Sequence, residues 1–113
     1  MEKDLEDRTK RFGLAVIKYC STLPRTGAID VLGRQLLRST TSIGANYREA
    51  NRGVSRADFV NKIGTVQKEA AETQYWLELR IESSIAKDQA AVLLQEASQL
   101  LAILTSIGKK LKG

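Results

Sequence analysis

Apolar side chains recur every three or four residues along most of this 113-residue chain, with polar side chains between them. This spacing is that of one face of an α-helix, whereas a half-buried strand alternates every two residues. In the first stretch, the positions that share one helical face are Leu5, Thr9, Phe12, Val16, Tyr19 and Leu23. Strand-like alternation is absent from the sequence. The pattern therefore predicts amphipathic helices throughout.

Turn signals divide the pattern into four segments. Pro24 removes a backbone donor and ends the first segment, after which Thr26 can cap a new helix. Gly53 ends the second segment, and Ser55 is suited to cap the third. The third boundary, within residues 82–89, contains no glycine and is less sharply marked.

These boundaries predict helices at about residues 4–22, 27–52, 56–83 and 87–110, within a single domain covering 1–113. Connections of a few residues force neighbouring helices to run antiparallel. We therefore expect an all-α fold, an antiparallel up-down-up-down four-helix bundle.

The apolar faces are broader than a narrow seam between two helices. In the last segment, the predicted core positions are Ala90, Leu94, Ala97, Leu101, Leu104, Gly108 and Leu111. Further apolar residues, including Leu37, Trp76, Leu93 and Leu100, lie outside the predicted stripes. Helices that pack on more than one side show such faces, so the pattern is consistent with self-association and also with a broad monomer core.

The composition argues against an enzyme. The chain has no histidine, which removes the commonest general base and the commonest metal ligand. Glu69 and Glu72 share a helix face, but a di-iron bundle would need Glu-x-x-His motifs. We interpret these two carboxylates as salt-bridging or interfacial, and expect no metal and no cofactor.

The sequence favours a cytoplasmic protein. Its N-terminus, MEKDLEDRTKRFG, is charged from the second residue, and no apolar run approaches the roughly 18 to 20 residues that span a bilayer. The single cysteine, Cys20, has no partner for an internal disulfide and is expected to be a small buried apolar residue. We expect no membrane partner.

The segment RSTTSIGANYREANRG, residues 38–53, combines hydroxyl side chains with three arginines. On a helical wheel, Arg34, Arg38, Arg48 and Arg52 fall between roughly 320° and 40°, opposite apolar positions at roughly 160° to 220°. We call these four residues the arginine ridge. Thr41 and Ser42 lie between its two arginine pairs, where short side chains leave the arginines accessible.

Charge is concentrated in the same segment. From Arg25 to Arg56 there are six arginines against Asp30 and Glu49, which gives +4 of the total of +5. The planar guanidinium fork suits phosphate or carboxylate. Three interpretations remain open: the arginines contact nucleic acid, they contact carboxylates of another subunit or protein, or they form a solvated face held by weak pairs.

Three small or polar residues of this segment have predicted structural roles. Gly33 and Gly44 share a face beside the apolar stripe, and a glycine inside a helix costs about 1 kcal/mol relative to alanine. Their presence favours close approach of another helix. Asn46 falls at the edge of the core, where its amide is expected to form structural hydrogen bonds.

Residues 35–79 carry an ordered set of residue types. The set consists of Gln35-Leu36, Arg38-Ser39, Ser42-Ile43, Asn46, Glu49, Ser55, Asp58-Phe59, Glu69-Ala70, Glu72 and Trp76-Leu77. In this set the chain resembles the four-helix-bundle family encoded by intervening sequences of bacterial large-subunit ribosomal RNA genes. The resemblance implies a ring, typically a pentamer, without known catalytic activity. The family is similar in fold to the accessory protein of diversity-generating retroelements, a basic ring that binds a reverse transcriptase and nucleic acid.

We therefore predict a non-enzymatic, ring-forming homo-oligomer that contacts RNA, DNA or a ribonucleoprotein, possible partners being a reverse transcriptase or the ribosome. The predicted nucleic-acid-binding residues are Arg34, Arg38, Arg48, Arg52 and Arg56. The predicted interface residues are Glu69, Glu72 and Trp76. The alternative is a protein–protein assembly or adaptor module in which the arginines meet carboxylates and nucleic acid has no role.

Overall fold

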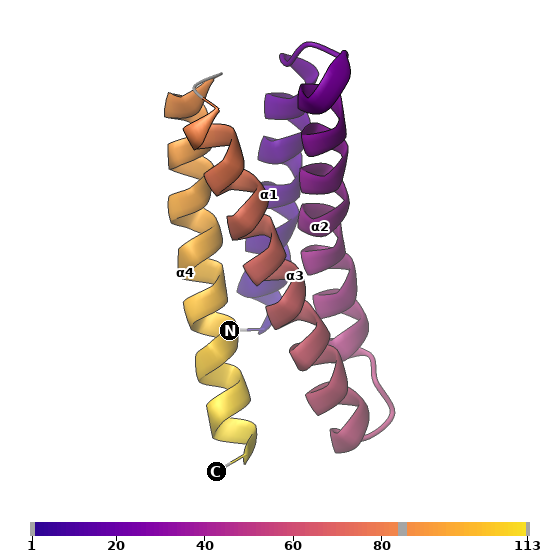
Figure 1. Cartoon of the computed structure of the whole chain (residues 1–113). Coiled ribbons are helices and arrows are strands. Elements are labelled where there is room, and N and C mark those ends of the chain that lie inside the picture. The colour runs from indigo at the N-terminus through magenta and orange to yellow at the C-terminus, as the bar shows by residue number, and fades with distance from the viewer. Residues whose placement is uncertain (1, 84–85, 113) are drawn as a thin grey trace.

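The computed structural model describes residues 2–83 and 86–112, apart from the side chains of Glu2 and Lys3. It contains the helices α1 (Glu2–Ser21), α2 (Gly27–Asn51), α3 (Arg56–Glu82) and α4 (Lys87–Lys112). Each bound lies within two residues of its predicted position. Consecutive helices run antiparallel in a rod of 43 × 21 × 21 Å (Figure 1). The predicted all-α four-helix bundle is confirmed, and the described residues form no strand.

Both predicted N-cap residues stand at the start of a helix. The Ser55 hydroxyl oxygen accepts a hydrogen bond from the Asp58 backbone N–H at 3.1 Å, which confirms the predicted cap of α3. Thr26 stands at the N-cap of α2, but its side chain makes no capping bond. The boundary before α4 lies partly outside the described residues. Ala86 there has a φ of 50°, a backbone conformation that glycine usually adopts. Because an alanine holds this position, the turn contains no glycine that would mark it in the sequence.

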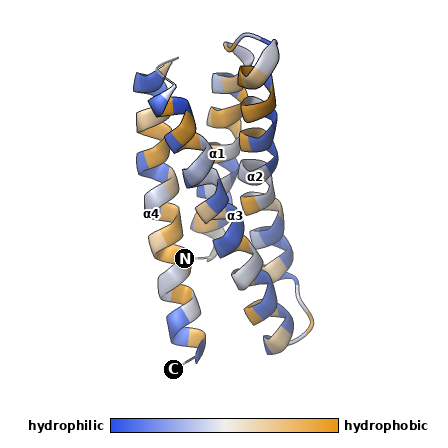
Figure 2. Ribbon diagram, viewed as in Figure 1, coloured by the Kyte–Doolittle hydropathy of each residue, from blue (hydrophilic) through white to orange (hydrophobic). Residues whose placement is uncertain are grey.

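The core follows the predicted faces closely on α1 and less closely on α4. All six predicted core positions of the first segment are buried, five of them on α1 and Leu23 just after it. On α4, Leu93 and Leu100 are buried, whereas the predicted Leu94 and Leu101 are only partly buried. This correction has a packing cause, because α4 packs extensively on α3 and only lightly on α1. Each helix presents both hydrophobic and hydrophilic positions (Figure 2).

The core also holds polar side chains, and two of them, Ser39 and Arg80, lie outside the stripes that the sequence predicts. Ser39 and Thr73 are fully buried, and their hydroxyl oxygens lie 2.8 Å apart in a hydrogen bond between α2 and α3. Arg80 is fully buried, with its Nε 3.4 Å from the Tyr19 hydroxyl and its guanidinium 6.0 Å from the centre of the Tyr19 ring. The aliphatic stem of an arginine lets it extend through apolar surroundings to such partners.

The length and composition of α4 correct one expectation. The mean hydropathy of α4 reaches 1.5 over 18 residues, so this helix is long and apolar enough to meet the criteria for a membrane span. From the sequence, no stretch was expected to meet them. By length and composition alone, a core helix meets the same criteria. In this bundle α4 supplies five fully or nearly fully buried residues, which are Ala90, Leu93, Ala97, Leu100 and Leu104.

Candidate nucleic-acid interface

The uninterrupted helix α2 places the arginine ridge at the surface. Arg34 and Arg38 have side chains that are 74% and 47% exposed. The corresponding values for Arg48 and Arg52 are 54% and 64%. The buried residues of α2, such as Leu36 and Ile43, occupy the opposite side of the helix. The predicted outward placement of these guanidinium groups is confirmed.

Arg38 turns toward α3, where the predicted interface residues lie. Its guanidinium forms ion pairs with Glu72 and, at 3.4 Å, with Glu69. The indole N–H of Trp76 donates to the same Glu72 carboxylate at 3.2 Å. Trp76 also contacts Tyr75 edge-to-face, with ring centres 5.2 Å apart. The structure thus brings all three predicted interface residues together with Arg38 inside one chain, and confirms that both carboxylates form salt bridges.

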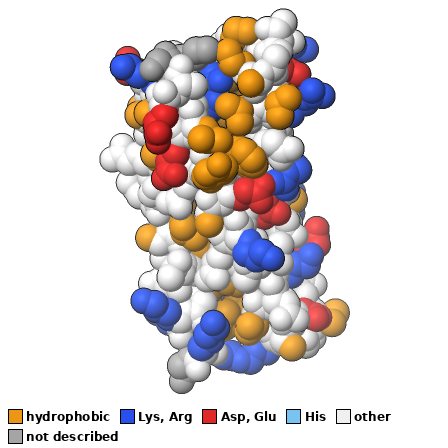
Figure 3. Space-filling model, in the orientation of Figure 1, with side chains coloured by type: hydrophobic (Ala, Val, Ile, Leu, Met, Phe, Trp, Pro, Cys, Tyr) orange, Lys and Arg blue, Asp and Glu red, His pale blue; other side chains and the backbone are white. Residues whose placement is uncertain are grey.

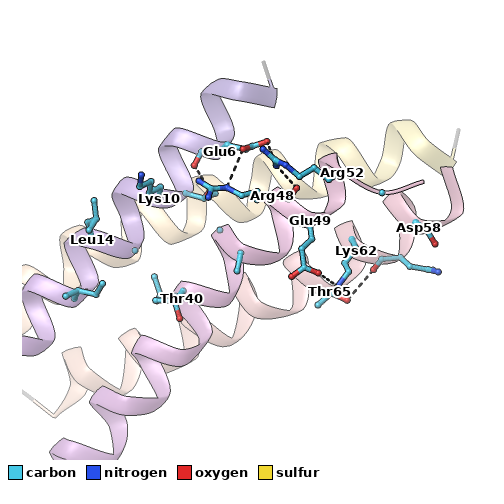
Figure 4. A pocket seen from close by; sticks show the side chains of 18 residues that line it. Glu6, Lys10, Leu14, Thr40, Arg48, Glu49, Arg52, Asp58, Lys62 and Thr65 are labelled. Atoms are coloured by element: carbon cyan, nitrogen blue, oxygen red, sulfur yellow. Dashed lines mark hydrogen bonds and ion pairs between the residues drawn. The ribbon is translucent and has the colours of Figure 1, made fainter. Parts of the chain in front are cut away.

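Arg48 and Arg52 turn the other way, toward α1, and share one carboxylate (Figure 4). The Glu6 oxygens lie 3.6 Å from Arg48 Nε and 3.5 Å from Arg52 Nη1. The Asn51 amide donates to Glu6 at 2.8 Å. This hydrogen bond, followed by the positive charges of Arg52 and Arg48, lowers the pKa of Glu6 below its ordinary value.

The other two predicted nucleic-acid-binding arginines also have partners within the chain. Arg34 pairs with Asp30 one turn earlier, at 3.1 Å. Arg56, at the start of α3, donates to the Leu111 carbonyl oxygen at 2.6 Å. The ridge is therefore not one free row of cations. Ten residues separate Arg38 from Arg48, which rotates the second side chain by roughly 80° and aims the two at different neighbouring helices.

The hydroxyl run has two roles. Ser39 and Thr40 point into the bundle and are fully buried, whereas Thr41 is exposed and donates to the Leu37 carbonyl oxygen of its own helix at 2.8 Å. Gly44 allows α1 to approach, because a Cβ there would lie 3.4 Å from the Thr9 hydroxyl oxygen.

Two further predictions concern residues near this run. At Gly33 a Cβ would meet no heavy atom within 4 Å among the described residues, so close packing of another part of this chain does not account for it. Asn46 is half-buried and donates to the Ser42 carbonyl oxygen at 2.8 Å, as a structural amide should.

Net positive charge gathers at one end of the rod. We define the basic end as the half containing residues 2–11, 42–69 and 99–112, where the α2–α3 connection and the end of α4 lie. It holds 12 Lys and Arg against 7 Asp and Glu, whereas the other half holds 6 of each. On the face shown in Figure 3, basic side chains predominate near this end. Sequence reasoning assigned most of the net charge to α2 and its flanks, because it could not know that the lysines at the end of α4 lie beside the α2–α3 connection.

The described residues offer little for metal chemistry. In residues 2–83 and 86–112, no three Cys, Asp or Glu side chains are grouped so as to hold a metal ion. Cys20 is half-buried rather than fully buried, and its burial raises the pKa of the thiol.

Comparisons with known proteins identify the family. A sequence profile described as 23S rRNA-intervening sequence protein matches residues 3–106. Among solved structures, the chain is similar to a Bacteroides thetaiotaomicron protein described as of unknown function, from the S23 ribosomal protein family. The two share 36% sequence identity with a TM-score of 0.83, over 93% of this chain and 98% of that one. No curated protein matches. Neither match indicates an enzymatic family. The chain belongs to the 23S rRNA-intervening sequence protein family.

Proposed function

We propose that this protein is a non-enzymatic, cytoplasmic bundle that binds nucleic acid, as free RNA or within a ribonucleoprotein, through its basic end. The observation that carries this proposal is the charge distribution: the whole excess of +5 lies in one half of the rod. Arg48, Arg52 and Arg56, three of the five predicted contacts, belong to that half. The matched family takes its name from 23S rRNA intervening sequences, which is compatible with an RNA partner but does not identify one.

The internal ion pairs do not prevent such binding. Arg48 and Arg52 are more than half exposed and lie 3.5 Å or more from the Glu6 oxygens. Exposed pairs of this kind contribute about 0 to 1 kcal/mol, so a phosphate can replace the carboxylate at small cost. Counterion release from the nucleic acid then supplies most of the affinity.

The test is the salt dependence of binding to a generic single-stranded RNA, measured by fluorescence anisotropy from about 50 to about 200 mM salt. Arg48→Gln with Arg52→Gln should lower the slope of log K against log salt by about 1.4, at about 0.7 per lost contact. The matched control, Arg34→Gln with Arg38→Gln, removes the same charge from the same helix in the neutral half. It should change the slope less. Equal effects of both pairs of substitutions, or no binding of RNA by the wild type, would contradict the proposal that nucleic acid binds at the basic end.

A second function, assembly into a homo-oligomeric ring such as a pentamer, is favoured by the surface beside Arg38. Tyr75, which contacts the half-buried Trp76, is 52% exposed there, and Val31 on α2 is 51% exposed. Figure 3 shows hydrophobic side chains gathered over α2 and α3, beside acidic ones. Exposed aromatic residues near arginine are typical of protein interfaces. Light scattering should show an oligomer that Tyr75→Glu dissociates, and the same mass for the wild type and the variant would contradict this function.

A further inference from the structure

The outer face of α1 is apolar and basic. Two large apolar side chains there, Leu14 and Ile17, are 55% and 46% exposed. Three exposed cations flank them and take part in no ion pair in the part of the chain that the structure describes. We define the α1 patch as Lys10, Arg11, Leu14, Ile17 and Lys18. On a helical wheel these positions span roughly 120°, opposite the buried Phe12 and Val16. The helix has four basic residues and no acidic one within residues 8–21.

The outer face of the second half of α3 is apolar and acidic. Tyr75 is 52% exposed and Leu79 is half-buried. Glu78 and Glu82 are exposed and form no ion pair among the described residues. We define the α3 patch as Glu72, Tyr75, Glu78, Leu79 and Glu82. Within residues 69–82 there are four glutamates and one cation, and that cation is fully buried.

The two patches lie on opposite sides of the rod at the same height. Both α1 and α3 pack on α2 and α4, which places them at diagonal corners of the bundle (Figure 1). They also run in the same direction. Arg80 Nε lies 3.4 Å from the Tyr19 hydroxyl, so a residue of α1 lies at about the height of the α3 residue 61 positions later. By this offset Leu14 is level with Tyr75, and each of the two points away from the core.

The unpaired charges of both patches are displaced toward α4. On α1, Arg11 and Lys18 lie roughly 40° to 60° from the centre of the patch, on the side that bonds to α4. On α3, Glu78 and Glu82 lie roughly 20° to 60° from the centre of the patch, again on the side that bonds to α4. When two identical rods stand side by side in the same orientation, these flanks face each other. The cations of one copy then meet the glutamates of the next.

The opposite flanks, nearer α2, match as well. They hold Ile17 and Lys10 on α1, and Leu79 and Glu72 on α3. With the same offset between the helices, Ile17 stands beside Leu79 and Lys10 beside Glu72, each to within about one residue, or about 1.5 Å. The contact would thus have apolar side chains at its centre and opposite charges at its edges, which is the usual arrangement of a protein interface.

Two leucines of α4 enlarge the apolar area beside the α3 patch. Leu94 and Leu101 are partly buried against the core. They lie on the side of α4 that meets α3, because Ser98, one turn after Leu94, accepts a hydrogen bond from Gln74 at 3.0 Å. A copy that docks on the α3 patch can therefore also cover these leucines.

We infer that copies of this chain join head to tail, with the α1 patch of one copy on the α3 patch of the next. The occupant is a second copy because the chain itself carries the acidic surface that complements its basic one, at the same height and with matching flanks. A contact between two different faces can close into a ring, and closure requires that no shift along the rod accumulates. Patches at the same height meet this condition. The inference rests on the homo-oligomeric assembly proposed above and names the surface that receives Tyr75.

Charge reversal tests this contact. Arg11→Glu with Lys18→Glu makes the α1 patch acidic, and Glu78→Lys with Glu82→Lys makes the α3 patch basic. Each pair alone brings like charges together, so the mass from light scattering at about 50 mM salt should fall to that of a single chain, with the helical circular dichroism unchanged. All four substitutions in one chain again place opposite charges across the contact, and should restore the wild-type mass.

The matched control is Arg25→Glu with Arg34→Glu, which reverses two exposed arginines outside both patches and should keep the wild-type mass. The inference is overturned if either patch variant keeps the wild-type mass, if the fourfold variant remains a single chain, or if the control dissociates as well. A wild type that is itself a single chain would contradict the proposed assembly together with this contact. Lost RNA binding by the α1 variant at unchanged mass would also overturn the inference, since the α1 patch would then bind nucleic acid.

Discussion

Two glycines at the α3–α4 side of the bundle permit a test of how closely the helices pack. Gly64 lies inside α3, and a Cβ there would meet no heavy atom within 4 Å among the described residues. Gly108 lies in the last two turns of α4, where a Cβ would be 2.5 Å from the Gln67 side-chain nitrogen. The same substitution, glycine to alanine, should therefore have different consequences at the two positions.

The magnitudes follow from the local contacts. Gly64→Ala restricts the backbone conformations of the unfolded chain, and the added methyl group clashes with nothing in the folded chain. The substitution should therefore stabilise the protein by about 0.5 to 1 kcal/mol. Gly108→Ala gains at most a similar amount but displaces the Gln67 amide, which donates to the Leu104 carbonyl oxygen at 2.9 Å. Losing that bond costs about 1 kcal/mol, so the net change should be close to zero. The difference between the variants should be near 1 kcal/mol, or about 4 °C in Tm for a chain of this length.

Urea and thermal unfolding, followed by circular dichroism at low protein concentration, measure both effects. In a Gln67→Ala background no amide remains to be displaced, so Gly108→Ala should become as stabilising as Gly64→Ala. The reasoning is refuted if Gly108→Ala stabilises the wild type as much as Gly64→Ala does. A destabilising Gly64→Ala would also refute it, since the position would then have a close neighbour that the single chain does not contain.

Three further predictions concern stability. Ser55→Ala removes the N-cap bond of α3 and should cost about 1 kcal/mol in urea unfolding, whereas Ser55→Asp should not. Ser39→Ala and Thr73→Val should each destabilise by about 1 kcal/mol, and a double-mutant cycle should show coupling because their hydroxyls are bonded to each other; strict additivity would contradict that bond. The lowered pKa of Glu6 means that its carboxylate stabilises the fold above its ordinary pKa of 4.5, and that this contribution is lost as pH falls through the lower folded value. Glu6→Gln should therefore be less stable than the wild type near neutral pH, and the two stabilities should converge in acid.

Helix positions were predictable because they depend on local signals. The predicted face of the first segment, from Leu5 to Leu23, keeps a regular three-four spacing, and each of its positions is buried. On α4, two adjacent rows of leucine compete, and only contact with α3 decides that Leu93 faces the core instead of Leu94. Arg80 was missed for a similar reason: it contacts Tyr19, which is 61 residues away in the chain.

The sequence predicted that the arginines of the candidate site are exposed, but it did not predict which carboxylates they pair with. A helical wheel places Arg38 and Arg48 on the outside of α2, and both are exposed. Which carboxylates they reach depends on the helices packed at either side, and these supply Glu6 from α1 and Glu72 from α3.

The ion pairs leave the two halves of the arginine ridge with different net charges, and therefore with different attraction for a polyanion. Arg38 is held by two carboxylates, Glu69 and Glu72, so this cluster has a local charge of −1 at neutral pH. Arg48 and Arg52 share the single carboxylate of Glu6, so their cluster retains +1. An approaching phosphate is thus repelled by the first cluster and attracted by the second, over distances comparable to the Debye length of about 8 Å at physiological salt. The Arg38 cluster, which also includes the Trp76 indole, is better suited to a protein contact. The residues that the sequence placed in one predicted nucleic-acid surface therefore divide into a group that keeps a net positive charge at the basic end and a group bound to carboxylates at the middle of the rod.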